Sequence, residues 1–234
     1  MNELKVCVFD SQELLQRLTP QWNALLEESD SESVFLSWEW LTAWAQYCIF
    51  GNRKLFVLTV MENEKLIGIA PFYIERKMYG PFALREIHFL GSPETGSDYL
   101  NVFTRRGREK DVANALFNFL MWDAKNEWDS IWLQDIPSHS LFLLSFTSRI
   151  RELGKYCELS LSAYCPVAEL PATEEEYFSK ISSNRRKRFN QYKNILNREG
   201  KVVHEVYGDA LPDQLLDEFY KFYEEKGGWS AESV

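Results

Sequence analysis

The sequence predicts an α/β domain of layered α+β type, in which a mixed, mostly antiparallel sheet is flanked by helices. Three observations predict it. Strand and helix patterns alternate irregularly over the first 170 residues, without a regular strand–helix–strand repeat. Several of these strands follow one another through short turns, which is typical of antiparallel pairs. The chain is also long enough, at 234 residues, and apolar enough, at 45% hydrophobic residues, to bury a large core.

The first elements are a strand and a helix. Residues 4–9 predict a short strand, and Ser11 is a candidate N-cap for a helix that runs toward Glu28. Leucines and Trp22 recur there at helical spacing. Because Pro20 interrupts this pattern, we expect the helix to kink or break at that point.

A tryptophan-rich helix follows, with Ser37 as its candidate N-cap. Trp40, Trp44 and Tyr47 are spaced so that they share one helical face. Core packing is the favoured interpretation of this stripe. The alternative is a stacking surface for a ligand, and on that interpretation Trp40 and Trp44 are candidate substrate-binding residues.

The middle of the chain is rich in strand patterns. Residues 54–62 and 65–79 predict two strands joined by a turn at Asn63-Glu64. Pro71 predicts an edge position or a bulge in the second strand, since proline has no N–H to donate. The later expected elements are strands at 84–90, 99–104 and 130–136, helices at 111–126 and 138–152, and strand candidates at 156–161 and 166–170.

The loop at residues 91–99 is a candidate functional segment. It joins two strands, so it can place the carboxylate of Asp98 and the phenol of Tyr99 at the end of a sheet. An aspartate there can orient or deprotonate an amine, which makes Asp98 and Tyr99 the candidate catalytic residues. The favoured competing interpretation is a turn in which Asp98 bonds to its own backbone.

The composition changes near Pro171, which predicts a first lobe over residues 1–170 and a second part over 171–234. In the second part Thr173 has the pattern of a helix N-cap. A helix ending at Gly200, a strand at 202–207 and a helix at 211–225 are expected to follow.

The stretch 182–201 is strongly basic, with seven basic residues and one acidic residue. Arginine binds phosphate and other anions through paired hydrogen bonds, so Arg185, Arg186 and Arg188 are candidate substrate-binding residues. The competing interpretation, slightly favoured, is a solvated face that pairs with the acidic segment after it. Binding of nucleic acid is not expected, because the net charge of the chain is −9.

Several other chemistries lack support. The four cysteines form no CxxC pair and suit neither zinc nor a disulfide framework, so we expect no metal site. Motifs of serine hydrolases, zinc proteases and P-loop proteins are missing. His88 stands alone in a strand, on the face opposite to Ile87 and Phe89, and the sequence supports no catalytic role for it. With no apolar leader and no apolar run of spanning length, we expect a cytoplasmic protein without a membrane span.

Four segments together resemble the CelD-like, FemAB-related branch of the GNAT acyltransferase superfamily. They are the tryptophan-rich segment 35–44, the strand 66–72, the pair of segments 89–91 and 97–100, and the basic helix 185–200 with its Leu-x-x-x-Gly ending. Their order and spacing carry the resemblance, which extends over about residues 20–228.

The resemblance implies two GNAT-like lobes, of which the second is only begun in this chain. It implies transfer of an acyl group from acetyl-CoA to a small-molecule or saccharide amine, in cell-envelope or polysaccharide synthesis. Peptidoglycan-directed relatives use aminoacyl-tRNA as the donor. The residues that would bind the donor are unknown, because the family's pyrophosphate loop, [Q/R]xxGx[G/A], has no match, with residues 65–70 the nearest.

Two further functions compete with acyl transfer. One is a non-catalytic lobe that binds an anionic saccharide or a nucleotide-sugar, which the missing pyrophosphate loop favours if the chain is complete. The other is a nucleic-acid binder that uses the basic helix, which the acidic net charge counts against. An incomplete second lobe would expose an apolar edge, which favours association into oligomers.

Overall fold

The computed structural model describes residues 4–31, 33–93, 96–200, 203, 205–207 and 212–225. The chain forms two compact units, Met1–Ala163 and Tyr164–Val234, and each is described by itself. Whether the second unit begins a further lobe at residue 171 stays a prediction. No helix in the described part of the chain is both long enough and apolar enough to cross a membrane.

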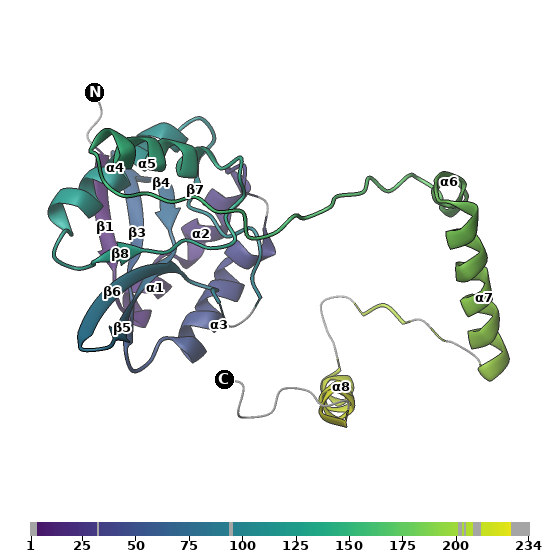
Figure 1. Ribbon diagram of the computed structural model, residues 1–234. Coiled ribbons are helices and arrows are strands. Elements are labelled where there is room, and N and C mark those ends of the chain that lie inside the picture. Colours follow the sequence, from purple (N-terminus) through teal and green to yellow (C-terminus); the bar gives the residue numbers. More distant parts are fainter. Residues whose placement is uncertain are drawn as a thin grey trace. The chain divides into compact units, whose positions relative to one another are not determined.

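The first unit contains two four-stranded sheets, with the strand orders β1-β3-β4-β7 and β2-β5-β6-β8 (Figure 1). Every pair of neighbouring strands is antiparallel except β6 and β8. The strands are β1 (Leu4–Phe9), β2 (Arg53–Leu55), β3 (Val57–Glu62), β4 (Lys65–Ala70), β5 (Phe72–Tyr79), β6 (Phe82–Phe89), β7 (Phe103–Thr104) and β8 (Ser130–Ile131). The prediction of a mixed, mostly antiparallel sheet flanked by helices is confirmed.

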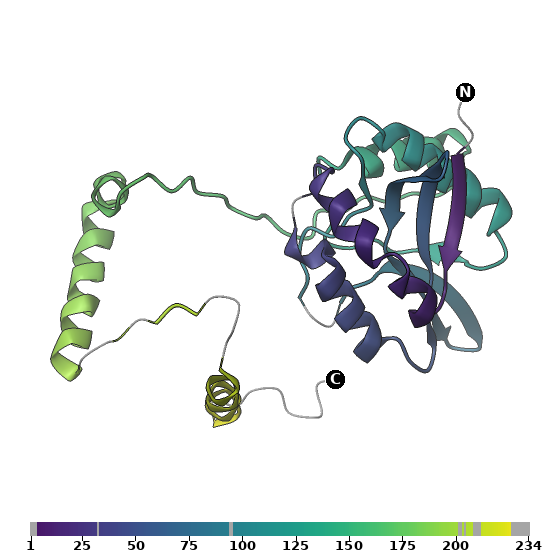
Figure 2. The same ribbon diagram turned by 180° about the vertical axis from the view of Figure 1, so that it is seen from behind.

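Helices cover both faces of these strands. Figure 2 shows the first three helices lying across one face, and α4 packs on the strands from the other side. The helices of this unit are α1 (Gln12–Gln16), α2 (Thr19–Glu27), α3 (Trp38–Cys48), α4 (Glu109–Asn118) and α5 (Leu141–Glu152), with a 3₁₀ turn at Val34–Leu36 and a π-helical turn at Phe119–Asp123.

The helix caps expected at Ser11, Ser37 and Thr173 are confirmed. The side chains of Ser11, Ser37 and Thr173 each accept a hydrogen bond from a backbone N–H three residues further on. The predicted break before Glu28 lies between α1 and α2, and Pro20 stands in the first turn of α2. Proline is tolerated there because the first N–H groups of a helix have no intrahelical partner.

The prediction for Pro71 is wrong, because the residue marks neither a sheet edge nor a bulge. Strands β2 and β3 pair with β5 and β4 as one long hairpin. Its register is constant around Pro71, from Leu55 opposite Tyr73 to Leu58 opposite Ala70, and shifts only between Val60 and Met61. Pro71 stands between β4, whose other neighbour is β7, and β5, whose other neighbour is β6. Its carbonyl accepts a hydrogen bond of 2.8 Å from the N–H of Leu90, so the chain passes between the sheets there.

Several expected strands are shorter or missing. Pairing covers only β7 within the expected 99–104 and only β8 within the expected 130–136. The candidates at 156–161 and 166–170 form no regular structure, and within the described part of the chain no strand pairs with them. A strand pattern is insufficient there because a β-strand needs a neighbour to satisfy its backbone groups. The strand expected at 202–207 lies largely outside the described residues.

The second unit contains the helices α6 (Glu174–Lys180), α7 (Ser183–Glu199) and α8 (Asp213–Glu225). The N–H of Gly200 donates to the carbonyl of Leu196, which confirms the expected end of the basic helix. Phe189 of α7 packs against Phe178 of α6, with ring centroids 4.8 Å apart.

Close packing of α4 on β4 depends on Gly68. A Cβ at this position would lie 2.6 Å from Cγ1 and 2.8 Å from Cγ2 of Val112, which is buried. We expect Gly68→Ala to lower the free energy of unfolding by about 1–3 kcal/mol, because overpacking forces neighbouring groups to shift. Urea unfolding measures the change. In the Val112→Ala background the same substitution should lower the free energy of unfolding clearly less. An equal loss of stability in both backgrounds would show that the contact with Val112 does not cause it.

Candidate active site

The last residues of strand β6 contribute polar side chains to a buried face of their sheet. Ile87 and Phe89 point into the core, whereas Glu86 and His88 alternate with them and lie on the opposite face. The ladder between β6 and β8 ends where the N–H of Trp132 donates to the carbonyl of Ile87, at 2.8 Å. The alternation of side chains along β6 thus places the titratable groups of Glu86 and His88 on one face, where the pairing of β6 with β8 ends.

The hairpin register adds the next residues. Glu75 of β5 lies directly opposite Glu86 of β6, and Tyr73 lies opposite His88. Like charges opposite one another destabilise a strand pair unless other charges offset them. Lys77 does so here, with its Nζ 3.4 Å from Glu75 Oε2 and 3.3 Å from Glu86 Oε2.

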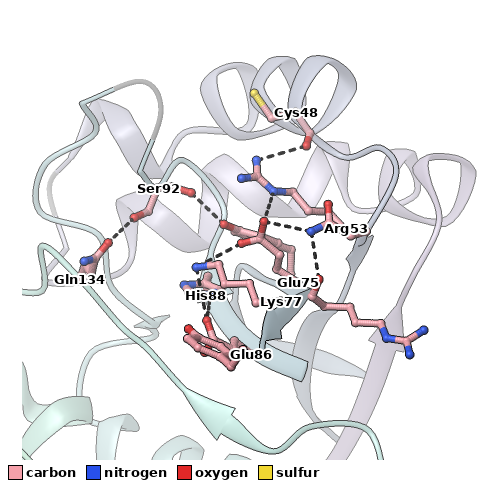
Figure 3. Close-up of polar contacts among 12 residues, drawn as sticks. Cys48, Arg53, Glu75, Lys77, Glu86, His88, Ser92 and Gln134 are labelled. Atoms are coloured by element: carbon pink, nitrogen blue, oxygen red, sulfur yellow. Dashed lines mark hydrogen bonds and ion pairs between the residues drawn. The ribbon is translucent and has the colours of Figure 1, made fainter. Parts of the chain in front are cut away.

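A fourth charge completes what we call the charge cluster, which is defined as Arg53, Glu75, Lys77 and Glu86. The Nε of Arg53 donates to Glu75 Oε1 at 3.2 Å. Both glutamates are buried, at 8% and 3% exposure. Their two negative charges are balanced by the two cations, as buried ionised groups require. Figure 3 shows these side chains converging on one face of the sheet below α3.

His88 lies at the inner end of the charge cluster. It is 7% exposed, and its ring stacks on Tyr73 with centroids 5.3 Å apart. Its Nε2 is 3.2 Å from Glu86 Oε2. Because a carboxylate only accepts hydrogen bonds, Nε2 carries the hydrogen and Nδ1 carries the lone pair.

The environment keeps His88 uncharged near neutral pH. Burial lowers its pKa from the ordinary value of 6.5, and the charge of Lys77 lowers the pKa further, against the opposing effect of Glu86. Burial disfavours ionisation of Glu75, but Arg53 and Lys77 outweigh this effect and lower the pKa of that carboxyl. The arrangement therefore combines a neutral imidazole that has a lone pair with the carboxylate of Glu86 at its Nε2, and such a pair has the chemistry of a general base.

The shift at His88 has a consequence for stability. The unfolded chain takes up a proton on this histidine near pH 6.5, whereas the folded chain does so only at lower pH, so acidification favours unfolding. The lowered pKa of Glu75 acts in the same direction below its ordinary value of 4.5. We expect the free energy of unfolding in urea to fall between about pH 7 and pH 5. In His88→Gln this part of the profile should flatten, and an unchanged slope would contradict the lowered pKa.

The candidate loop 91–99 is tied to the helical side of the unit. Ser97 Oγ accepts a 2.9 Å hydrogen bond from Trp40 Nε1, and the hydroxyl of Ser33 donates to the carbonyl of Asp98 at 3.3 Å. Asp98 is exposed, and its charge helps to raise the pKa of Asp135, after the larger effect of burial. Tyr99 has a φ of 56° and is 46% exposed. The catalytic roles of Asp98 and Tyr99 stay predictions.

The tryptophan stripe is divided between different environments. Trp44 is buried and packs on Tyr73 at 5.2 Å between centroids, which confirms core packing for this residue. Trp40 is partly buried and holds the loop through Ser97, whereas Tyr47 is exposed. The substrate-binding roles of Trp40 and Trp44 stay predictions.

The basic candidates lie in the other compact unit. Arg185, Arg186 and Arg188 are exposed on α7, and a guanidinium nitrogen of Arg186 donates to the carbonyl of Ile181 at 3.3 Å. Their proposed role in binding an anion is considered for that unit alone.

The charge cluster was not predicted from the sequence, and His88 was given no role there. A signal was present, since polar residues occupy every second position of β5 and of the end of β6. The turn at Gly80-Pro81 also pairs position 75 with position 86. What the sequence did not show is that α3 and β2 would bury this face and supply Arg53.

The start of α4 does not fit the diphosphate of CoA. A helix N-terminus binds phosphate when its first N–H groups are available. Here the N–H of Gly107 donates to the carboxylate of Glu109, and Asp111 adds a second acid to the first turn. The guanidinium of Arg108 bonds to Glu62 and Asp111. The carboxylates of Glu109 and Asp111 at this helix start repel a diphosphate.

Comparisons with known proteins find likeness in structure but not in sequence. No protein-family model and no curated protein matches the chain. Solved structures that share its general arrangement include acetyltransferases. One is an aminoglycoside acetyltransferase from an uncultured soil metagenomic sample, in complex with trehalose, with 12% identity over 71% of this chain and 97% of that chain and a TM-score of 0.42.

Two more are a ribosomal-protein-alanine N-acetyltransferase from Brucella melitensis (12% identity, 70% of this chain, 99% of that chain, TM-score 0.40) and an aminoglycoside N-acetyltransferase in complex with CoA (10% identity, 72% of this chain, 97% of that chain, TM-score 0.41). A likeness at these TM-scores assigns neither a family nor an activity to this chain.

Proposed function

We propose that the first compact unit is an N-acyltransferase domain that transfers an acyl group to an amine, with His88 as general base and Glu86 as its partner. The observation that carries the proposal is the buried, neutral His88 whose Nε2 is held by Glu86, 3.2 Å away. This arrangement leaves the lone pair of the imidazole on Nδ1. The four motifs of the sequence that resemble the CelD-like, FemAB-related GNAT branch support the same reaction.

The chemistry needs one proton acceptor. An amine attacks an activated acyl group only after it has lost a proton, which His88 Nδ1 accepts. The carboxylate of Glu86 then stabilises the imidazolium that forms. The new carbon–nitrogen bond replaces the bond to the leaving group, which departs with its electron pair. Since Glu86 and His88 are held by the sheet, little reorganisation is needed at the moment of reaction.

Other parts of the proposal are more specific. The donor is acetyl-CoA and the acceptor is a small-molecule or saccharide amine, in cell-envelope or polysaccharide synthesis. Asp98 and Tyr99 would orient the acceptor, and the arginines of α7 would bind an anionic ligand within the second unit. Because the start of α4 does not fit a diphosphate, we place no CoA-binding residue in the described part of the chain.

The test is a direct assay of the full chain with acetyl-CoA and a panel of amines that includes amino sugars, in which released thiol and acetylated product are both measured. We expect product formation that depends on protein and on His88. Binding of an acceptor without turnover would instead support the alternative function, a non-catalytic lobe for an anionic saccharide or nucleotide-sugar. The misfit at α4 counts against CoA as donor and against a nucleotide-sugar alike, so it favours this alternative for an anionic saccharide without a diphosphate.

A further inference from the structure

A second polar site lies outside the charge cluster. It is a pocket of about 390 Å³ formed by the loop after α2, the segment that enters β7, and the first residues of α4 and α5. This volume is within the range of small-molecule sites. The polar lining residues include Asp30, Tyr99, Asn101, Glu109, His139 and Ser140.

The pocket has hydrogen-bonding groups that are already fixed in position. Ser140 Oγ donates to Asn101 Oδ1 at 2.8 Å and accepts from the N–H of Leu143 at 3.2 Å. The amide nitrogen of Asn101 donates to Ser31 Oγ at 3.3 Å. Ser140 is buried, and so are Val102 and Phe142, which add apolar surface to the lining. A chain of oriented hydroxyl and amide groups over an apolar surface suits a ligand with several hydroxyl groups.

The charges in the pocket select the ligand further. Asp30 and Glu109 supply two carboxylates, and among the described lining residues there is no lysine or arginine. Asp30 is held by the side chain of Arg106, at 2.8 Å, and Glu109 by the N–H of Gly107, at 2.9 Å. The guanidinium of Arg106 offsets the charge of Asp30, so Glu109 is the carboxylate that would repel an anionic ligand such as a diphosphate and give an ammonium group a charge-assisted hydrogen bond.

The aromatic ring of Tyr99 completes the recognition surface. It lines the pocket and is 46% exposed, so one part of the ring is accessible. An aromatic face binds both a cation and the apolar side of a sugar ring. The ligand must therefore combine hydroxyl groups with a positive charge.

We infer that this pocket binds a hydroxylated primary amine of the amino-sugar class. The inference concerns binding of the amine and does not rest on the proposed function, because His88 is not among the residues that line this pocket. The experiment therefore measures binding to the full chain without any acyl donor, so that its failure is distinct from a failure of the transfer assay.

The probe is glucosamine, titrated by calorimetry and compared with N-acetylglucosamine, which lacks the charge, and with ADP, which carries a diphosphate. We expect glucosamine to bind, N-acetylglucosamine to bind about tenfold more weakly, and ADP not to bind. Glu109→Gln should weaken glucosamine binding by about tenfold, and Asp30→Asn should weaken it less, because Arg106 offsets the charge of Asp30. Neither side chain is buried, and circular dichroism checks that both variants fold.

The matched control is Glu13→Gln, which removes the same charge from an exposed residue of α1 that does not line the pocket. It should bind glucosamine as the unaltered protein does. The inference is overturned if glucosamine does not bind at millimolar concentrations, if all three variants bind it equally, or if ADP binds in a way that depends on Glu109.

Discussion

Glu86→Gln is expected to lower kcat for acyl transfer to the best acceptor by about 10²–10⁴-fold. Glutamine keeps the shape of the side chain and can still accept from His88 Nε2, so the imidazole remains in place. What is lost is the negative charge 3.2 Å from the ring, which stabilises the imidazolium in the transition state. The measurements are steady-state rates and their pH profile, in which the acidic limb should move to lower pH because the pKa of His88 falls.

Glu75→Gln is the matched control for this experiment. It removes the same charge from the same charge cluster, and its side chain bonds to Arg53, Lys77 and Asn52 rather than to the histidine. Both variants should lose a similar stability, about 1–3 kcal/mol, because each leaves a buried cation with one partner fewer. A loss of activity in Glu75→Gln as large as that in Glu86→Gln would assign the effect to stability, and the proposed pair would be rejected.

Trp22→Ala is expected to cost about 3–5 kcal/mol of the free energy of unfolding. Trp22 is fully buried, and its ring meets Trp38 at 5.6 Å and Phe103 at 5.5 Å between centroids. Its Nε1 also donates a 2.8 Å hydrogen bond to the carbonyl of Leu36. One side chain therefore joins α2 to the 3₁₀ turn, to α3 and to β7, and its removal leaves both a cavity and an unpaired carbonyl.

Trp22→Phe separates the two contributions. Phenylalanine fills much of the space but has no N–H, so the cost should fall to about 1–3 kcal/mol, mainly from the unpaired carbonyl of Leu36. Urea unfolding with circular dichroism measures both variants. If Trp22→Phe is as unstable as Trp22→Ala, the hydrogen bond to Leu36 accounts for most of the lost stability, and the packing of the ring contributes little.

The sequence was most informative where structure depends on neighbouring residues. The caps at Ser11 and Ser37, the interruption at Pro20 and the turn at Asn63-Glu64 all lie where the patterns predict them. The placement of His88 on the face opposite to Ile87 and Phe89 is also confirmed. These features follow from backbone geometry and the alternation of side chains along a strand, which a short segment determines by itself.

The candidate site was predicted less well, since its parts come from distant segments. The loop with Asp98 and Tyr99 was found from composition, and Tyr99 does line a pocket. The partner of His88 was not found, although Glu86 is only two residues away, because two residues on one strand face become a pair only when that face is buried. The segments at 156–170 show the opposite error, since local β-propensity does not supply a neighbouring strand.

Most element types, several helix starts and the face on which the residues of β6 lie could thus be read from the amino-acid sequence. Tertiary packing was needed to show that the long hairpin crosses between two sheets at Pro71, that Arg53 and Lys77 balance Glu75 and Glu86, and that separate segments enclose a pocket. Local conformation depends on dihedral preferences over a few residues, whereas desolvation, charge pairing and cavity shape depend on which distant residues pack together.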